Sequence, residues 1–450
     1  MLVKGLENLS DEDCLQQIQE NIYMQYFVGL RSLTIRPLFT PEVLVAVRKR
    51  LGEESMSELN ELVLKVAQGT VMKHRARYGT KAGKDNTNLI NRGILKVDAT
   101  VCPEDLRFPT DTRLLNEARL FTEQMIDHLF DLGYYEKKPR TYRKVAAEYY
   151  LNFAKKKSPG NKQIRKCKKQ QLQYLRRNLK HINVMLDAYE TGKGIGLPHM
   201  DGKTYRSYLV VQHIYDQQWI MYRDGRKNVK DRIVNLSKPW VRPIVRGKAG
   251  KKTEFGSKIN VSETEGMVKV DRIDFNNYNE AKDLEAIVED YKRLYGYYPQ
   301  SVLVDKIYLN RENRKMLKER GIEHYGAQLG RPKGYNKEEK RWCKKRQNKR
   351  SEIEGKFGLG KLKYGMNKIR MKYAETSKAH MHLIAISMNI WQLWQKLKLF
   401  SSQLINKQTN EIGQRINFMI QIILLNLLVL IQLKNISSSP ETIGSYDRIY

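Results

Sequence analysis

The spacing of apolar residues predicts two short helices near the start of the chain, within a helical region at residues 1–75. Thr40 supplies a capping hydroxyl and Pro41 suits the first helical position, so we expect a helix that begins there and ends near Gly52. The next helix places its apolar side chains on one face: Leu59, Leu62, Val63 and Val66.

Three consecutive cations in the first of these helices are candidate DNA contacts. Two short helices joined by a tight turn form a DNA-reading unit when exposed basic side chains meet the duplex. The same pattern fits a plain helical hairpin equally well, so both interpretations stay open. The cations, which we expect to be exposed, are Arg48, Lys49 and Arg50.

Residues 76–92 are polar and rich in Gly and Asn, which is typical of a linker. β-Type residues at 94–97 then predict a strand that leads into Asp98 and stops at the following proline. The pattern turns helical again at residues 113–192, where apolar side chains form one stripe: Leu172, Leu175, Leu179, Ile182, Met185, Leu186 and Tyr189.

The opposite face of this amphipathic helix is strongly basic. Residues 155–180 contain eleven Lys and Arg and no Asp or Glu. A solvated surface is one interpretation, but charge without opposing acids favours a face that follows DNA phosphates. Lys168, Lys169 and Arg176 are its candidate DNA contacts.

The second half of the chain predicts a β–β–α–β order over residues 242–308. We expect a basic loop with Arg246 and Lys248, followed by strands near 254–262 and 266–275. A helix should follow, with these residues on one face: Leu284, Ile287, Val288, Tyr291 and Leu294. The last element is a strand at 300–308 that ends on Asp305. A basic stretch at 331–350 and an apolar helix at 376–395 follow.

Charge narrows the class of partner. The 450 residues include 82 Lys and Arg against 49 Asp and Glu, a formal net charge of +33. Such an excess is typical of proteins that bind a polyanion, most often nucleic acid, although a merely supercharged protein has the same composition. Four widely spaced cysteines disfavour a zinc site or a disulfide framework, so we expect a reduced, cytoplasmic setting.

Two segments bear on membranes. The N-terminus lacks the apolar run of a signal peptide. Residues 416–433 are almost long and apolar enough to span a bilayer, but Gln421 and Asn426 lie well inside the segment. We therefore expect a terminal helix packed on the body or on a partner chain, and no membrane association.

Two predicted strands carry an aspartate at or just past their apolar run, Asp98 and Asp305. Neighbouring strand ends lie close together, and two adjacent carboxylates repel unless a cation lies between them. Oxygen ligands suit Mg²⁺ or Mn²⁺, and such a site on a basic surface suits phosphodiester chemistry. Either aspartate alone is more often a turn-former or a helix cap.

Residues 350–361, RSEIEGKFGLGK, add a third acid. If the stretch is helical, Arg350, Glu354 and Lys361 share one face, whereas Glu352 points away toward solvent. A carboxylate between two cations then serves as a metal ligand flanked by phosphate-binding groups. Taken alone, the stretch is better interpreted as a surface helix with charge pairs.

At this point the chain resembles the bacterial insertion-sequence transposases that carry a DDE catalytic triad on an RNase H-like fold. The resemblance spans about residues 20–395. It rests on five stretches: LFTPEVLVAVRKRLG (38–52), VDATVCPEDLRFPTDTRLLNEAR (97–119), RPIVRGKAGKKTEFGSKINVS (242–262), VDKIYLNRENRKMLKERGI (304–322) and RSEIEGKFGLGKLKYGMNKI (350–369).

The resemblance implies a role for each matched residue. Asp98, Asp305 and Glu354 match the catalytic acids, which in this family hold two Mg²⁺ or Mn²⁺ ions. Arg350 and Lys361 match the cations of an Arg-x3-Glu-x6-Lys pattern. In related transposases a tyrosine often stands three residues before that arginine, and this chain has Gln347 there.

The implied architecture is α/β: an RNase H-like catalytic core with a helical insertion, an all-α N-terminal domain and a helical C-terminal tail. The expected divisions are a DNA-binding domain at 1–75, a linker at 76–92, a catalytic domain at 93–395 with a basic insertion at about 113–192, and a divergent tail at 396–450. The tail matches no pattern of the family.

The implied activity is transposition. Such a protein binds double-stranded DNA at both ends of its element as an oligomer, a dimer by expectation, cleaves a strand, and joins the freed 3′-hydroxyl to target DNA. Its expected location is the cytoplasm, associated with the nucleoid. The alternative is an inactive transposase-derived protein that binds DNA without cutting it.

Overall fold

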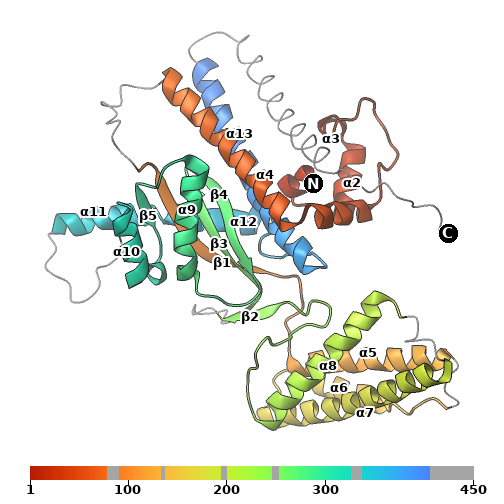
Figure 1. Ribbon diagram of the computed structural model, residues 1–450. Helices are drawn as coiled ribbons and strands as arrows, with labels where there is room; N and C mark the ends of the chain where they lie inside the picture. Colours follow the sequence, from red (N-terminus) through yellow and green to blue (C-terminus); the bar gives the residue numbers. More distant parts are fainter. Residues whose placement is uncertain (79–90, 133–136, 194–199, 246–252, 326–336, 406–450) are drawn as a thin grey trace.

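The computed structural model describes residues 1–78, 91–132, 137–193, 200–245, 253–325 and 337–405. These residues form a mixed α/β structure in which helices cover both faces of one sheet (Figure 1). The predicted membrane-length segment at 416–433 lies outside the described residues. Among the helices of the described ranges, none combines the length and apolar character needed to cross a bilayer.

The chain begins with a helical region, as predicted. Its helices are α1 (Leu2–Glu7), α2 (Asp11–Glu20), α3 (Ile22–Phe27) and α4 (Pro41–Tyr78). Gly52 breaks α4 with φ 65° and ψ −170°, which confirms the expected end of one helix and start of the next. Because α4 continues to Tyr78, the linker predicted from residue 76 starts later, and its residues 79–90 lie outside the described ranges.

The N-terminal helices share a core with the end of the chain. The second half of α4 packs along α13 (Ala374–Ile405), where Met56, Val63 and Ala67 meet Ile386 and Leu393 (Figure 1). The predicted apolar helix at 376–395 is thereby confirmed as buried. Since α13 continues without a break to Ile405, no structural boundary separates residues 395 and 396.

Within the described residues the sheet has six strands: β1 (Ile94–Pro103), β2 (Arg242–Val245), β3 (Thr253–Thr264), β4 (Met267–Asp274), β5 (Ser301–Leu303) and β6 (Glu323–His324). They lie in the order β2-β3-β1-β5-β6, and β4 pairs with β3. The predicted strands β3 and β4 are confirmed, whereas the strand expected over 300–308 is shorter. Asp305 caps a 3-10 turn, η2 (Lys306–Tyr308), so the strand ends before it.

Each face of the sheet has its own helical cover. Helices α9 (Leu284–Tyr295) and α10 (Arg311–Glu319) cover the face that contains Leu95 and Val97. Helices α12 (Ser351–Lys363) and α13 cover the other face, where Cys102, Ile259 and Ile353 share a core. Side chains alternate between the two faces along a strand, so Lys96, Asp98 and Thr100 of β1 all point toward α12.

A helical bundle is inserted between β1 and β2. It contains α5 (Asp111–Asp131), α6 (Arg143–Ala154), α7 (Asn161–Lys193) and α8 (Gly202–Arg223), so the insertion reaches beyond the predicted residue 192. Leu115, Leu175 and Ile214 belong to a core that the bundle does not share with the sheet. In Figure 1 the bundle lies beside the sheet, below it in the view.

Candidate catalytic cleft

The register of two parallel strands brings the predicted aspartates together. β1 pairs with β5 so that Ile94 is opposite Ser301 and Lys96 is opposite Leu303. This offset, 301 − 94 = 207, equals the separation of the two aspartates, 305 − 98 = 207. Asp305 lies two residues beyond the last paired residue of β5, as Asp98 lies two residues beyond Lys96, and both line the same cleft.

Asp98 lies in the middle of β1, which ends at Pro103, so the predicted strand that leads into Asp98 and stops at the proline is confirmed. The pairing of β1 with β5 stops at Lys96, but its antiparallel pairing with β3 continues to Pro103. One side of Asp98 thus has a neighbouring strand and the other is open. That opening is where Asp305, at the start of η2, enters the cleft.

Helix α12 supplies the third acid. Ile353 is buried in the core, and Gly360 is packed against Met366 and Met388, which fixes the rotation of the helix. The predicted shared face of Arg350, Glu354 and Lys361 is confirmed, because all three line one cleft with Asp98 and Asp305.

A single guanidinium joins two of the acids. Nη1 of Arg350 lies 2.7 Å from Oδ2 of Asp98, and Nη2 lies 2.6 Å from Oε1 of Glu354. On the next turns of the same helix, Nζ of Lys361 donates to Oγ1 of Thr100 at 3.0 Å. These contacts tie both ends of α12 to alternate residues of β1.

Glu352 lies outside the cleft but is not simply a solvent-facing residue. Its side chain is 56% exposed, yet its Oε2 is 2.7 Å from Nζ of Lys96. Lys96 is buried and also forms an ion pair with Glu263 at 2.5 Å. The lysine needs acidic partners because a buried cation is costly when unpaired. Glu352 therefore anchors the first turn of α12 to β1.

The electrostatics of the cleft reflect crowded acids. Burial is the main reason that the pKa of Asp98 lies above its usual value, and the charges of Asp305 and Glu354 raise it further. Arg350 and the backbone N–H of Ala99 act in the opposite direction by stabilising the carboxylate. The arrangement therefore brings together three acids whose mutual repulsion a cation would relieve.

The donor set fits a hard divalent cation, since all three acids offer carboxylate oxygens. Within the described ranges, however, no three Asp, Glu, His or Cys side chains are arranged to hold a metal ion. The guanidinium of Arg350 lies between Asp98 and Glu354 and forms an ion pair with each. The chemistry of the donors thus suits Mg²⁺ or Mn²⁺, and Arg350 competes for the same oxygens.

Several cleft residues were not predicted from sequence. Lys258 and Glu280 form an ion pair beside the acids, and Tyr278 lines the same cleft. Gln347 donates to the carbonyl of Val304 at 2.8 Å, so it holds the segment before α12 against the residue that precedes Asp305. Strand alternation places Lys258 on one face of β3, and the position of Gln347, three residues before Arg350, is where related transposases often have a tyrosine, but no local signal links Glu280 to the site.

The structure separates the predicted DNA contacts of the N-terminal helices. Arg48 is 2% exposed and forms an ion pair with Asp11 on α2, so the expectation of an exposed DNA contact is wrong for this residue. It faces α2 because its turn of α4 packs there. Lys49 and Arg50 are exposed.

The basic insertion shows a similar division. Lys168 pairs with Asp111 at the start of α5, where Arg232 pairs with the same acid. The acid that balances Lys168 therefore comes from another helix, α5. Lys169 and Arg176 are exposed on α7. The predicted contacts Arg246 and Lys248 lie outside the described residues.

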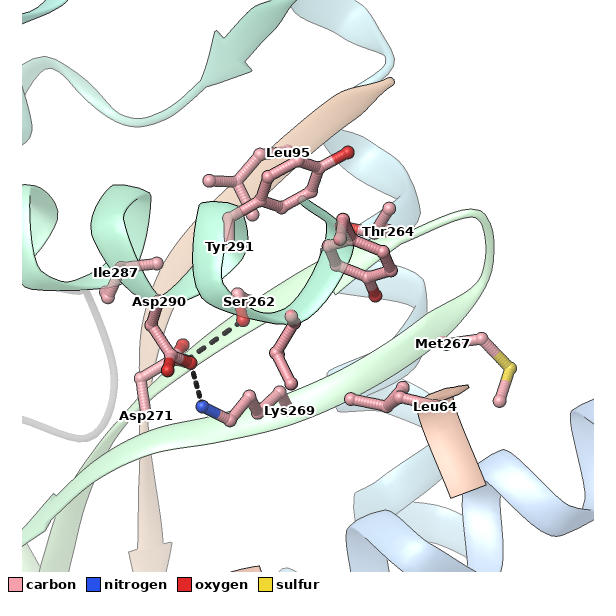
Figure 2. A pocket seen from close by; sticks show the side chains of 12 residues that line it. Leu64, Leu95, Ser262, Thr264, Met267, Lys269, Asp271, Ile287, Asp290 and Tyr291 are labelled. Carbon is pink, nitrogen blue, oxygen red and sulfur yellow. Dashed lines mark hydrogen bonds and ion pairs between the residues drawn. The ribbon is translucent and has the colours of Figure 1, made fainter. Parts of the chain in front are cut away.

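A second, enclosed charged cluster lies between α4, α9 and the sheet (Figure 2). Lys269 forms ion pairs with Asp290 and with Glu61, and Arg293 pairs with the same two acids. Ser262 donates a hydrogen bond to Asp271, and burial raises the pKa of Asp271 to about 7. The cluster contains none of the predicted site residues.

Comparison with known proteins assigns part of the chain to a family. Residues 302–391 match the family model described as "Transposase DDE domain", a range that includes Asp305, Arg350, Glu354 and Lys361. A stretch of 116 residues is 29% identical to the uncharacterized protein ORF8 in the nfe locus of Rhizobium meliloti. That stretch covers 26% of this chain, and the chain spans about half of that protein, 49% of its length. No solved structure matches the chain significantly.

Proposed function

The chain carries a transposase DDE domain, and from this premise we propose that it is the transposase of an insertion sequence. In this proposal it cuts one DNA strand at each end of its element and joins the freed 3′-hydroxyl to target DNA. The observation that carries the proposal is the convergence of Asp98, Asp305 and Glu354 in one open cleft with Arg350 and Lys361.

We also propose an RNase H-like core. β4, β3 and β1 form an antiparallel run, and β5 and β6 continue from β1 in parallel, which supports this fold. The core spans residues 93–395 and carries α5–α8 as an insertion. The helices of residues 1–75 help to recognise the terminal repeats, and residues 396–450 form the tail.

The proposed chemistry divides between ions and side chains. Asp98, Asp305 and Glu354 would hold two Mg²⁺ or Mn²⁺ ions, and such ions would supply activation of an attacking oxygen and stabilisation of a leaving oxygen. Arg350 and Lys361 bind the non-bridging oxygens of the phosphate that reacts, because they lie on both sides of Glu354 along α12. Thr100 orients Lys361 through the hydrogen bond between their side chains.

The proposed partner is double-stranded DNA, bound by a dimer of this chain. The net charge of +33 supports a polyanionic partner. Exposed Lys49 and Arg50 on α4, and Lys169 and Arg176 on α7, are the proposed phosphate contacts that remain once Arg48 and Lys168 are assigned to ion pairs.

The test is end cleavage by the purified full-length chain with Mg²⁺ on duplexes that carry the DNA flanking the gene. We expect strand nicks at the element ends with the natural chain, and about 10³-fold slower nicking with the Asp98→Asn or Glu354→Gln variant. Undiminished cleavage by either variant would contradict the assignment. Specific binding without cleavage by the natural chain would instead identify an inactive, DNA-binding relative of transposases.

A further inference from the structure

We propose that Arg350 couples DNA binding to metal binding, and this inference rests on the function proposed above. In the proposal, its guanidinium holds Asp98 and Glu354 together until a DNA phosphate takes it over. The two carboxylates then become free to bind the divalent cation. DNA and metal therefore bind cooperatively, and Arg350 is the residue that links them.

The first support is the geometry of the bridge. Separate nitrogens of one guanidinium lie 2.7 Å from Asp98 and 2.6 Å from Glu354, the distances of charge-assisted hydrogen bonds. A divalent cation requires lone pairs of the same carboxylates. Arg350 and the cation are therefore competitors for these oxygens, and full occupancy by one excludes the other.

The second support is the balance of charge. Four acids line the cleft, Asp98, Glu280, Asp305 and Glu354, against three cations, Lys258, Arg350 and Lys361, and the single charge of Arg350 is shared between Asp98 and Glu354. Among the described residues, no ion pair with Asp305 is formed, and its Oδ1 accepts only the backbone N–H of Lys306, at 2.7 Å. The cleft therefore keeps a net negative charge with the bridge in place, which continues to attract a cation.

The third support is that Arg350 is able to leave. Its backbone carbonyl accepts the N–H of Ile353 in the first turn of α12, but its side chain makes no capping hydrogen bond, so the guanidinium can move without breaking the helix. Its side chain is 22% exposed and lines both the cleft and an adjoining pocket that includes Tyr325 and Gln347. A phosphate in either space meets the guanidinium, which binds phosphate oxygens in a two-pronged geometry.

A purely structural role makes the opposite prediction about metal binding. If Arg350 served only to fix α12 on β1, its removal would scatter the carboxylates and weaken any metal site. If it competes with the metal, its removal strengthens metal binding in the absence of DNA. Linkage also requires the effect to be reciprocal, so metal must tighten DNA binding to the same degree that DNA tightens metal binding.

The experiment is a calorimetric titration of Mn²⁺ into the full-length chain, with and without a DNA duplex. We expect the Arg350→Gln variant to bind Mn²⁺ about tenfold more tightly than the natural chain when no DNA is present. Adding DNA should tighten Mn²⁺ binding by the natural chain about tenfold and leave the variant almost unchanged. Asp98→Asn introduced into the Arg350→Gln variant should abolish the tight site, which locates it in the cleft.

Arg346→Gln is the matched control for loss of one positive charge. Arg346 lies on α11 (Lys337–Asn348) against Tyr325 and Trp342, and it pairs with Glu323 rather than with the cleft acids. We expect its Mn²⁺ affinity to match that of the natural chain. If the glutamine variant of Arg350 does not fold, Arg350→Lys keeps the charge but cannot bridge both acids, and it should shift the affinity in the same direction.

The outcomes separate this inference from the proposed function. If the natural chain binds Mn²⁺ and the Arg350 variants bind it equally or more weakly, the coupling is overturned but the proposed metal site stands. An equal gain in Mn²⁺ affinity by the Arg346→Gln variant also overturns the coupling. The gain would then come from the loss of any one positive charge. No Mn²⁺ binding by any variant, with or without DNA, overturns the proposed catalytic site itself.

Discussion

Two charged clusters lie on opposite faces of the same sheet, and they differ in charge balance and in access. In the open cleft, Arg350 faces the acids Asp98, Asp305 and Glu354. In the enclosed cluster, Lys269 and Arg293 balance Glu61 and Asp290; Figure 2 shows Lys269 and Asp290. The space beside the second cluster is about 20 Å³, whereas the cleft holds about 1030 Å³, so the cleft alone of these two has room for a DNA strand and an ion.

A raised pKa alone does not distinguish the two regions. Burial raises the pKa of Asp98 in the cleft and raises that of Asp271 to about 7 in the enclosed cluster. Asp98 opens onto a cleft with cations that suit phosphate. Oδ2 of Asp271 is buried and accepts no hydrogen bond from the described residues. The open cleft and the cations beside Asp98 therefore identify the candidate catalytic site, and the raised pKa of Asp98 supports this choice.

The comparison predicts that Glu354 and Glu352 differ sharply although they lie two residues apart. Glu354→Gln should lower strand cleavage about 10³-fold, since about 4 kcal/mol of transition-state stabilisation is lost with a metal ligand. Glu352→Gln should lower it only a few-fold, because the residue anchors α12 without entering the cleft. Cleavage rates of the two purified variants are the measurement, and equal losses would remove the distinction.

The enclosed cluster should affect stability instead of activity. Lys269→Met leaves Asp290 and Glu61 with the half-exposed Arg293 as their remaining cation, so we expect the free energy of unfolding to fall by about 2 kcal/mol. Lys315→Met is the control, because its pair with Glu319 is exposed and contributes about 0.5 kcal/mol or less. Chemical denaturation measures both, and cleavage per folded molecule should be unchanged by either substitution.

Arg48 and Arg50 extend the comparison to the N-terminal helices. Arg48→Ala should destabilise the chain by about 2 kcal/mol, since the buried ion pair with Asp11 is lost and only Lys4 remains as a partner. Arg50→Ala should leave stability almost unchanged but weaken DNA binding. A stable Arg48→Ala variant with reduced DNA affinity would reverse this assignment.

Asp271 should give the enclosed cluster a pH dependence. Its pKa in the folded chain is about 7, above the unfolded value, so the folded state binds the extra proton. Its contribution is fully present below about pH 4 and is lost as the pH rises through about 7. As the pH rises from 5 to 8, the free energy of unfolding of Asp271→Asn should therefore increase by about 1–2 kcal/mol relative to that of the natural chain. Denaturant titrations across this pH range are the measurement. If the stabilities of the natural chain and the variant change in parallel with pH, Asp271 does not bind the extra proton in the folded state.

Local patterns predicted the elements well, because each depends on its own residues. Gly52 breaks α4 since only glycine tolerates its φ of 65° at low cost, and the face of α12 follows from helical spacing. Partners from distant segments were beyond such patterns. Asp11 buries Arg48, and Lys96 recruits Glu352, through contacts that no local periodicity encodes.

Asp98 shows the same limit within one strand. The sequence marked the residue, but its place in mid-strand depends on β1 pairing with β3 beyond the end of β5. The common offset of 207 residues between the paired strands and between the aspartates was equally unavailable before the register was known. The pairing of β1 with β5 therefore brings together two aspartates that are weak candidates when each is considered alone.

The most direct test of the central claim asks whether Asp98 touches the catalytic metal. Asp98→Cys replaces a hard oxygen ligand with a soft thiolate, which binds Mg²⁺ poorly and Mn²⁺ better. We predict no strand cleavage by this variant with Mg²⁺ and recovery of at least about tenfold above that background with Mn²⁺, while Asp98→Ala stays inactive with both ions. Full Mg²⁺-dependent cleavage by either variant would contradict the account.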